Sequence, residues 1–187
     1  MGVIVLDGNC DEELKEIIAI CKSSSCSSGA KLRKAHYRAG EKIADLIVKN
    51  EKLTGKVAIV LMMRAGLPFG LGIADRMEEC GLCIDVFFSN VKISELNPDD
   101  YERIIFVDAV IRTGNEISEL AQSVAEDKKV IFAANVLDYT GVSRFSDKTL
   151  YAVRVSENSY KGTAQKKIEG GKGPDTGDRL FFSAFYQ

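Results

Sequence analysis

Hydrophobic residues in the N-terminal part of the chain recur at helical spacing. Leu14, Ile17, Ile18 and Cys21 lie three or four residues apart, which predicts an amphipathic helix. A Ser-rich loop over residues 22–29 separates it from a second helix, predicted over about residues 30–50. The apolar stripe of this second helix consists of Leu32, Ala35, Ala39, Ile43 and Leu46.

After Gly55 the pattern changes to short, largely apolar runs that alternate with helical segments. The runs predict strands at residues 57–62, 83–88, 104–107, 130–137 and 150–155, with helices at 67–80 and 116–126. Apolar strands of this kind are typical of a parallel sheet whose two faces are both covered. We therefore expect an α/β fold: a parallel sheet with helices on both faces and an N-terminal helical extension.

The length of 187 residues fits one domain, so residues 1–187 are expected to form a single unit. Its extension, residues 1–29, contains the first helix and the Ser-rich loop. Residues 157–178 are rich in Gly, Lys and Asp and have no periodicity, which predicts a long loop. A loop of that length inside a domain is usually functional or disordered.

Composition narrows the possible partners. The chain is 45% hydrophobic, which suits a folded core, and its net charge of −2 disfavours a general nucleic-acid clamp. The longest apolar run, residues 57–63, is shorter than a membrane helix requires, and the run at residues 3–6 is too short for a signal peptide. We expect a cytoplasmic protein that binds neither nucleic acid nor membrane.

Several motifs do not lead to a site. Cys80 and Cys83 form a C-x-x-C pair without a second half for zinc, and Cys80 ends a helix that Gly81 caps, so buried structural thiols are expected. A Gly70-Leu71-Gly72 stretch lies inside a helical pattern and does not complete a dinucleotide fingerprint. His36 is the single histidine, and a solvated helix flank is favoured for it over a phosphate or partner contact.

Candidate chemistry lies where two predicted strands end, because ligands of open parallel sheets bind beyond the carboxyl ends of the strands. After the strand at 57–62, Arg64 offers a planar cation, and Gly66 allows a tight turn into a helix whose amides can bind an anion. By itself this could be a glycine turn with a surface arginine. After the strand at 104–107 come Asp108 and then Thr113-Gly114 at the start of a helix. In that order the Asp108 carboxylate would face sugar hydroxyls, and the amides at the helix start would face a phosphate. An Asp turn followed by a Thr helix cap is the simpler alternative.

These segments resemble motifs of type I phosphoribosyltransferases, and more narrowly those of uracil phosphoribosyltransferases. Residues 108–115 resemble the family's phosphoribosyl pyrophosphate motif, Asp-Pro-Met-Leu-Ala-Thr-Gly-Gly, and residues 64–67 match its Arg-Ala-Gly-Leu pyrophosphate loop. Residues 171–181 resemble its C-terminal motif, Gly-x-Gly-Asp-Ala-Gly-Asp-Arg-x-Phe. The resemblance implies a phosphoribosyltransferase-like fold for the domain, with residues 157–181 as a C-terminal substrate loop.

The resemblance also implies a reaction and its residues. A base nitrogen would displace pyrophosphate from phosphoribosyl pyrophosphate with Mg²⁺, giving a nucleoside monophosphate, and the base would be uracil or a related pyrimidine. Arg64, Asp108 and Asp175 would be the catalytic residues, and Mg²⁺ would be held by the substrate and by Asp175. The family's dimers imply a homodimer. The remaining roles also follow the motifs: pyrophosphate at Arg64, Ala65, Gly66 and Asp175; ribose hydroxyls at Asp108; 5′-phosphate at Arg112, Thr113, Gly114, Asn115 and Glu116; base at Gly173, Pro174, Asp175 and Thr176.

The sequence departs from the family pattern at several of these positions. Asn115 and Glu116 replace a glycine and a small hydroxyl residue, and a carboxylate beside a phosphate is repulsive. Ser89 stands near the place of a second phosphate-binding arginine, and the segment at residues 90–100 is short. These departures keep a second hypothesis open, a non-catalytic protein of the same fold that senses a nucleotide or phosphoribosyl pyrophosphate.

Overall fold

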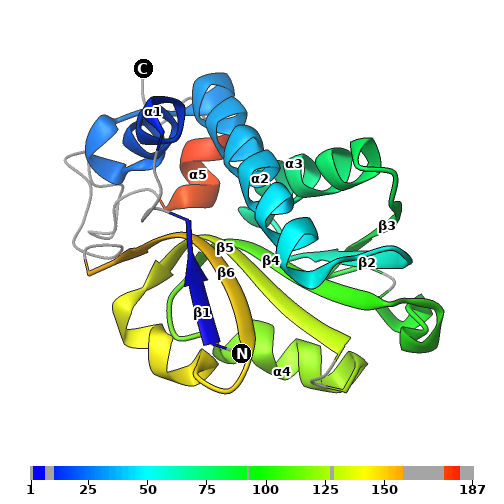
Figure 1. Cartoon of the computed structure of the whole chain (residues 1–187). Coiled ribbons are helices and arrows are strands. Elements are labelled where there is room, and N and C mark those ends of the chain that lie inside the picture. Colours follow the sequence, from blue (N-terminus) through cyan, green and yellow to red (C-terminus); the bar gives the residue numbers. More distant parts are fainter. Residues whose placement is uncertain (1, 7–10, 92, 127–128, 158–174, 182–187) are drawn as a thin grey trace.

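A six-stranded parallel sheet forms the centre of the protein, in the order β1-β6-β5-β4-β2-β3 (Figure 1). The computed structural model describes residues 2–6, 11–91, 93–126, 129–157 and 175–181. The predicted alternation of parallel strands and helices is confirmed. The strands are β1 (Gly2–Val5), β2 (Lys56–Leu61), β3 (Cys83–Phe88), β4 (Arg103–Ile111), β5 (Val130–Asp138) and β6 (Thr149–Ser156).

Helices cover both faces of this sheet, as the apolar strands predicted. One hydrophobic cluster joins the sheet to α1 (Glu12–Cys21), α2 (Gly29–Glu51) and α3 (Gly66–Glu79), and a second joins it to α4 (Asn115–Val124) and the 3₁₀ segment η6 (Tyr139–Phe145). The remaining described helices are short: η2 (Ser23–Ser25), η3 (Ile93–Glu95), η4 (Pro98–Asp100) and α5 (Thr176–Phe181). In Figure 1, α5 lies beside the N-terminal half of α2.

Three boundaries differ from the prediction. The chain begins with an edge strand, β1, which pairs with β6, so residues 1–29 are more than a helical extension. Strand β4 continues to Ile111 because its residues keep pairing with β5, which places Asp108 inside the strand instead of at its exit. Part of the predicted C-terminal loop is helical, since α5 occupies Thr176–Phe181.

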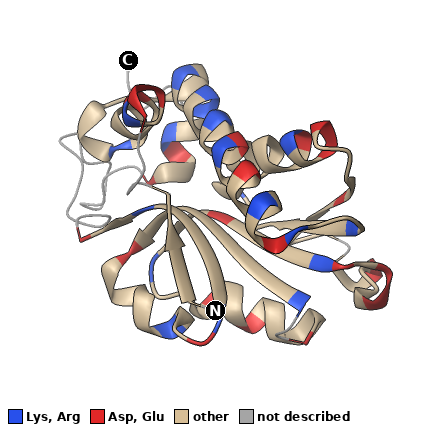
Figure 2. Cartoon of the chain, viewed as in Figure 1, with Lys and Arg blue, Asp and Glu red and all other residues tan. Residues whose placement is uncertain are grey.

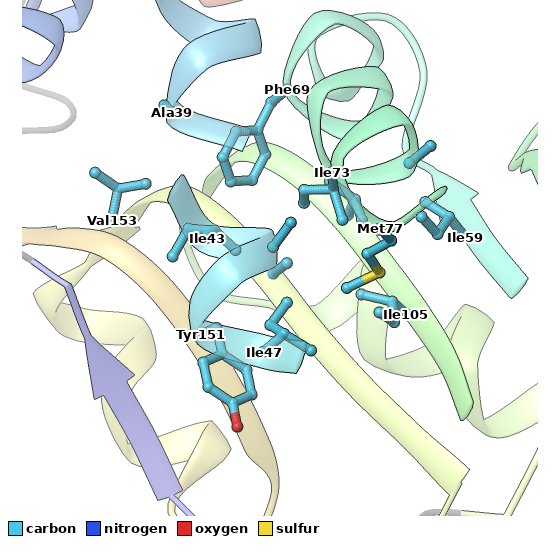
Figure 3. Packing of buried hydrophobic residues seen from close by; sticks show 14 of the residues in the cluster. Ala39, Ile43, Ile47, Ile59, Phe69, Ile73, Met77, Ile105, Tyr151 and Val153 are labelled. Atoms are coloured by element: carbon cyan, nitrogen blue, oxygen red, sulfur yellow. The ribbon is translucent and has the colours of Figure 1, made fainter. Parts of the chain in front are cut away.

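Helices α2 and α3 approach each other closely at two glycines. A Cβ on Gly72 would overlap the carbonyl oxygen of Tyr37, and a Cβ on Gly40 would overlap that of Phe69. The glycines let Phe69, Ile73 and Met77 of α3 and the stripe of α2 share one apolar layer over the sheet, together with Tyr151 of β6 (Figure 3). The Gly70-Leu71-Gly72 stretch therefore lies within α3, as its helical pattern indicated, and Gly72 allows α3 to pack closely against α2.

The cysteine prediction is wrong for the C-x-x-C pair, because Cys80 and Cys83 are both exposed. Gly81 does cap α3 as expected: its φ is 88°, its N–H donates to the Glu78 carbonyl, and the N–H of Leu82 donates to the Met77 carbonyl. Cys80 directly follows α3, and Cys83 is the first residue of the edge strand β3. The sequence predicted the helix cap at Gly81 correctly. It could not predict the exposure of the thiols, because that depends on which residues pack beside the turn.

Charged residues of α2 and α1 lie close to one another. Figure 2 shows Lys and Arg along α2, with the acidic residues of α1 nearby. Arg38 and Lys42 of α2 both pair with Glu13 of α1. None of the described helices combines the length and apolar character that crossing a membrane would need.

Candidate active site

The loop after β2 is held tightly against the neighbouring strands. The Met62 N–H donates to the Val107 carbonyl over 2.8 Å, and the Met63 N–H donates to Ser89 Oγ over 3.2 Å. A Cβ on Gly66 would lie 2.7 Å from the Val107 carbonyl oxygen. Gly66 is therefore required because α3 starts directly against β4, rather than for the tight turn that the sequence suggested.

Asp108 lies beside this loop, with its Cα 3.3 Å from where a Gly66 Cβ would be. Its Oδ1 accepts a 2.7 Å hydrogen bond from the Ala109 N–H. Burial raises the pKa of Asp108 to about 7; backbone N–H groups of Ala109 and Val110 oppose the rise, and the charge of Glu116 adds to it. The residue as a whole keeps partial solvent contact.

The turn between β4 and α4 places exposed residues around the start of α4. Gly114 has φ of 73°, and a Cβ there would lie 2.6 Å from the ring of Phe145, so both backbone and space require glycine. Thr113 Oγ1 accepts from the Asn115 N–H at 3.5 Å, which is a weak cap. Arg112, Thr113, Asn115 and Glu116 are exposed around the helix start. This arrangement can bind an anion through amides, the hydroxyl and the Arg112 guanidinium.

The C-terminal segment reaches the same edge of the sheet through α5. Arg64 Nη2 lies 3.1 Å from Asp178 Oδ1 and 3.9 Å from Asp175 Oδ1. A Cβ on Gly177 would come within 3.3 Å of the same guanidinium nitrogen. Asp175 also caps α5, because its Oδ1 accepts from the Asp178 N–H over 2.7 Å. The direct partner of Arg64 is Asp178, which lay in the quoted motif but was not assigned a role.

Two arginines hold α5 in this position. Arg179, which is buried, donates to the carbonyls of Ser27 and Lys22, and Arg33 of α2 donates to the Leu180 carbonyl over 2.6 Å. The Ser-rich loop and the C-terminal motif are therefore joined, although Ser27 and Arg179 are 152 residues apart in sequence. Of the predicted base-binding residues, Gly173 and Pro174 lie outside the described residues, and Thr176 faces the cavity described next.

A cavity of about 620 Å³ lies between the carboxyl ends of β4–β6, the loop after α1, and α5. His36 and Asn135, each 1% exposed, form part of its wall, and Asn135 Nδ2 lies 3.3 Å from His36 Nδ1. The prediction of a solvated His36 is wrong. Its pKa is lowered to about 3, first by burial and then by the charge of Arg179, so the imidazole is neutral. Cys21 in the same wall has a raised pKa because of burial.

Comparison with known proteins identifies the fold of this chain. No protein-family model matches the sequence, and no curated protein is similar to it. The structure resembles a crystal structure of an HGPRT-ase from Leishmania tarentolae in complex with GMP, with a TM-score of 0.50, 14% identity, and coverage of 64% of this chain and 78% of that one. The chain has a phosphoribosyltransferase fold. The predicted fold class is thus confirmed.

Two further solved structures are similar, with lower TM-scores. One is the protein TT1426 from Thermus thermophilus, with a TM-score of 0.47, 15% identity, and coverage of 66% of this chain and 84% of that one. The other is the hypoxanthine-guanine phosphoribosyltransferase from Schistosoma mansoni in complex with IMP, with a TM-score of 0.44, 18% identity, and coverage of 66% of each chain.

Proposed function

We propose that this protein transfers a phosphoribosyl group from phosphoribosyl pyrophosphate to a nucleobase, releasing pyrophosphate. The observation that carries the proposal is the convergence of three separate motifs at one sheet edge. The Arg64 loop lies against β4 beside Asp108, β4 leads into the anion-binding turn at Thr113, and Asp178 of α5 contacts Arg64. The fold shared with the GMP-bound HGPRT-ase supports the same reaction class.

The site suits a displacement that needs charge stabilisation and positioning, with no nucleophilic side chain. Negative charge builds on the leaving pyrophosphate, where Arg64 can donate a planar pair of N–H groups. Positive charge develops on the ribose, where the Asp108 carboxylate opposes it. Thr113 and the first amides of α4 would hold the 5′-phosphate and so fix the ribose between these charges.

The residues also fit a role for Mg²⁺. Within the part of the chain that the structure describes, no group of three or more His, Cys, Asp or Glu side chains is placed to bind a metal. Mg²⁺ commonly uses one or two carboxylates together with substrate phosphates, and Asp175 offers an exposed carboxylate 3.9 Å from Arg64. Asp175 would hold the ion with the pyrophosphate, and the bound ion would neutralise charge on the leaving group.

Uracil or a related pyrimidine is the base that the C-terminal motif supports. We also propose a homodimer, following the same family resemblance. The apolar stripe of α2 packs inside the chain, where Leu32, Ala35, Ala39 and Ile43 are buried, so the dimer does not rest on it. Light scattering at micromolar concentration tests the dimer, and a mass of one chain contradicts it.

The deciding experiment is incubation with phosphoribosyl pyrophosphate, Mg²⁺ and labelled uracil, with hypoxanthine and guanine in parallel. We expect uridine monophosphate and pyrophosphate in equal amounts. The Asp108→Asn variant keeps the shape of the carboxyl group but loses its charge, so kcat should fall more than KM for phosphoribosyl pyrophosphate rises. Ser123→Ala, on the far part of α4, is the matched control and should leave both constants unchanged. Product from a purine alone overturns the pyrimidine assignment, and no product from any base overturns the enzymatic proposal.

A second candidate function is binding of phosphoribosyl pyrophosphate or a nucleotide without turnover. The position of Glu116 favours it, since its carboxylate lies in the first turn of α4 and its charge acts on Asp108. Isothermal titration with phosphoribosyl pyrophosphate and with uridine monophosphate tests this candidate. Binding without product formation supports it, and the absence of heat for both ligands rules it out.

A further inference from the structure

The cavity beside the candidate active site is lined by residues from distant parts of the chain. His36 comes from α2 and Asn135 from β5, while Thr176 and Arg179 come from α5. Its volume of about 620 Å³ falls within the range usual for small-molecule sites. The same short helix that presents Asp178 to Arg64 therefore turns Thr176 and Arg179 toward this cavity.

The cavity adjoins the place where the ribose would lie. Val110, which lines it, is two residues beyond Asp108 on β4, and Thr176 directly follows Asp175. A ligand in the cavity would thus lie between β4, which carries the proposed ribose-facing carboxylate of Asp108, and α5, which lies on the proposed pyrophosphate side. A base attached to that ribose could therefore enter this cavity.

The buried polar groups of the wall are suited to a neutral heterocycle. A neutral imidazole has one N–H donor and one bare acceptor nitrogen, and an amide has an oxygen acceptor and two N–H donors. Asn135 Nδ2 is close to both ring nitrogens of His36, at 3.3 Å and 3.5 Å, so one amide hydrogen engages the bare nitrogen. The nearby positive charge of Arg179 is turned toward the carbonyls of Lys22 and Ser27.

From this placement we infer that the cavity is the base pocket, and that Asn135, held by His36, determines which base is bound by hydrogen-bonding its polar edge. The inference rests on the proposed transferase function. The ligand class is a planar, uncharged nitrogen heterocycle that carries an N–H beside a carbonyl, as uracil does. Asn135 can accept from that N–H and donate to that carbonyl, and His36 is a positioning residue that fixes the amide.

Two variants test the inference from different sides. Asn135→Leu keeps the approximate size of the side chain and removes both hydrogen-bonding groups, so KM for the base should rise about ten-fold or more while KM for phosphoribosyl pyrophosphate stays within about two-fold. Ser23→Trp fills the outer part of the cavity without touching the core and should raise the same KM. Ser123→Ala, on α4 and outside the lining of the cavity, is the control and should change neither constant.

The outcomes separate this inference from the proposed function. If the wild-type protein turns over a base and neither Asn135→Leu nor Ser23→Trp changes KM for that base, the cavity is not the base pocket. If the wild-type protein turns over no base, calorimetry with uracil in the presence of phosphoribosyl pyrophosphate decides. Uracil binding that both variants weaken supports the pocket, whereas no binding, or binding that both variants leave intact, overturns it. Circular dichroism of Asn135→Leu verifies folding, and Ser23→Trp decides if that variant is unfolded.

Discussion

Two buried titratable groups should give this protein opposing pH dependences of stability. The pKa of His36 is about 3 in the folded chain against an ordinary value of 6.5, so between these values the unfolded chain binds one more proton. The His36 contribution to stability is complete above pH 6.5 and is lost as pH falls toward the folded pKa. Asp108 acts in the opposite sense, because its folded pKa of about 7 lies above the ordinary 3.8 and the folded chain holds the extra proton.

The size of each effect follows from the linkage relation, about 1.4 kcal/mol per pH unit for one proton. Between about pH 4.5 and pH 6.0, His36 should add about 2 kcal/mol to the unfolding free energy as pH rises. Over the same interval Asp108 should remove up to about 2 kcal/mol, and less in proportion to its residual solvent contact. The two slopes largely cancel in the wild-type protein, and removing either group should expose the other.

Urea denaturation of the wild type, His36→Gln and Asp108→Asn at several pH values in that window measures these slopes. Relative to the wild type, His36→Gln should become more stable by about 2 kcal/mol on going from about pH 6.0 to pH 4.5. Asp108→Asn should move in the opposite direction. A stability difference between His36→Gln and the wild type that does not vary with pH would refute the buried, neutral state of His36. The exposed carboxylates do not interfere, because each variant is compared with the wild type at the same pH.

Three other substitutions follow from the same geometry. Gly72→Ala places a methyl group against the Tyr37 carbonyl and should lower the unfolding free energy by about 1–3 kcal/mol in urea denaturation, and unchanged stability contradicts the close α2–α3 contact. Thr113→Val removes a hydroxyl from the proposed phosphate site and should cost about 1.5–3 kcal/mol of phosphoribosyl pyrophosphate affinity by calorimetry, whereas equal affinity places the phosphate elsewhere. Glu116→Gln removes a like charge, so the same ligand should bind more tightly and the pKa of Asp108 should fall; unaltered binding means that the carboxylate points away from the phosphate.

Local patterns in the sequence were sufficient for most of the secondary structure. The predicted strand at 83–88 coincides with β3, and the helix predicted over about residues 30–50 matches α2 within a residue at each end. Hydrophobic periodicity predicts these elements because each long helix buries one face and each central strand is buried on both faces. The order of motifs at strand ends also predicted that these segments lie at one edge of the sheet, because a parallel sheet brings all carboxyl ends to one edge.

Elements whose stability depends on distant partners were missed. Strand β1 has only four residues, and it is a strand because it pairs with β6, which lies near the other end of the chain. Strand β4 extends past Asp108 for a similar reason, since its pairing with β5 continues to Ile111. In both cases the hydrogen-bonding partner lies outside any local window.

Some residues of the candidate site were likewise predicted from the sequence, and others were not. Arg64, Asp108 and Thr113 were singled out from the sequence because each comes after a predicted buried strand, with turn residues nearby. His36 was misplaced because helical spacing puts it beside the stripe of α2, on a flank that would be solvated if α2 stood alone. In the folded chain β5 and α5 cover that flank, with Asn135 in contact with His36 and the charge of Arg179 acting on it. Sequence periodicity determines which face of a helix is apolar, but only the packed chain decides what covers its edges, because burial is set by residues that are distant in sequence.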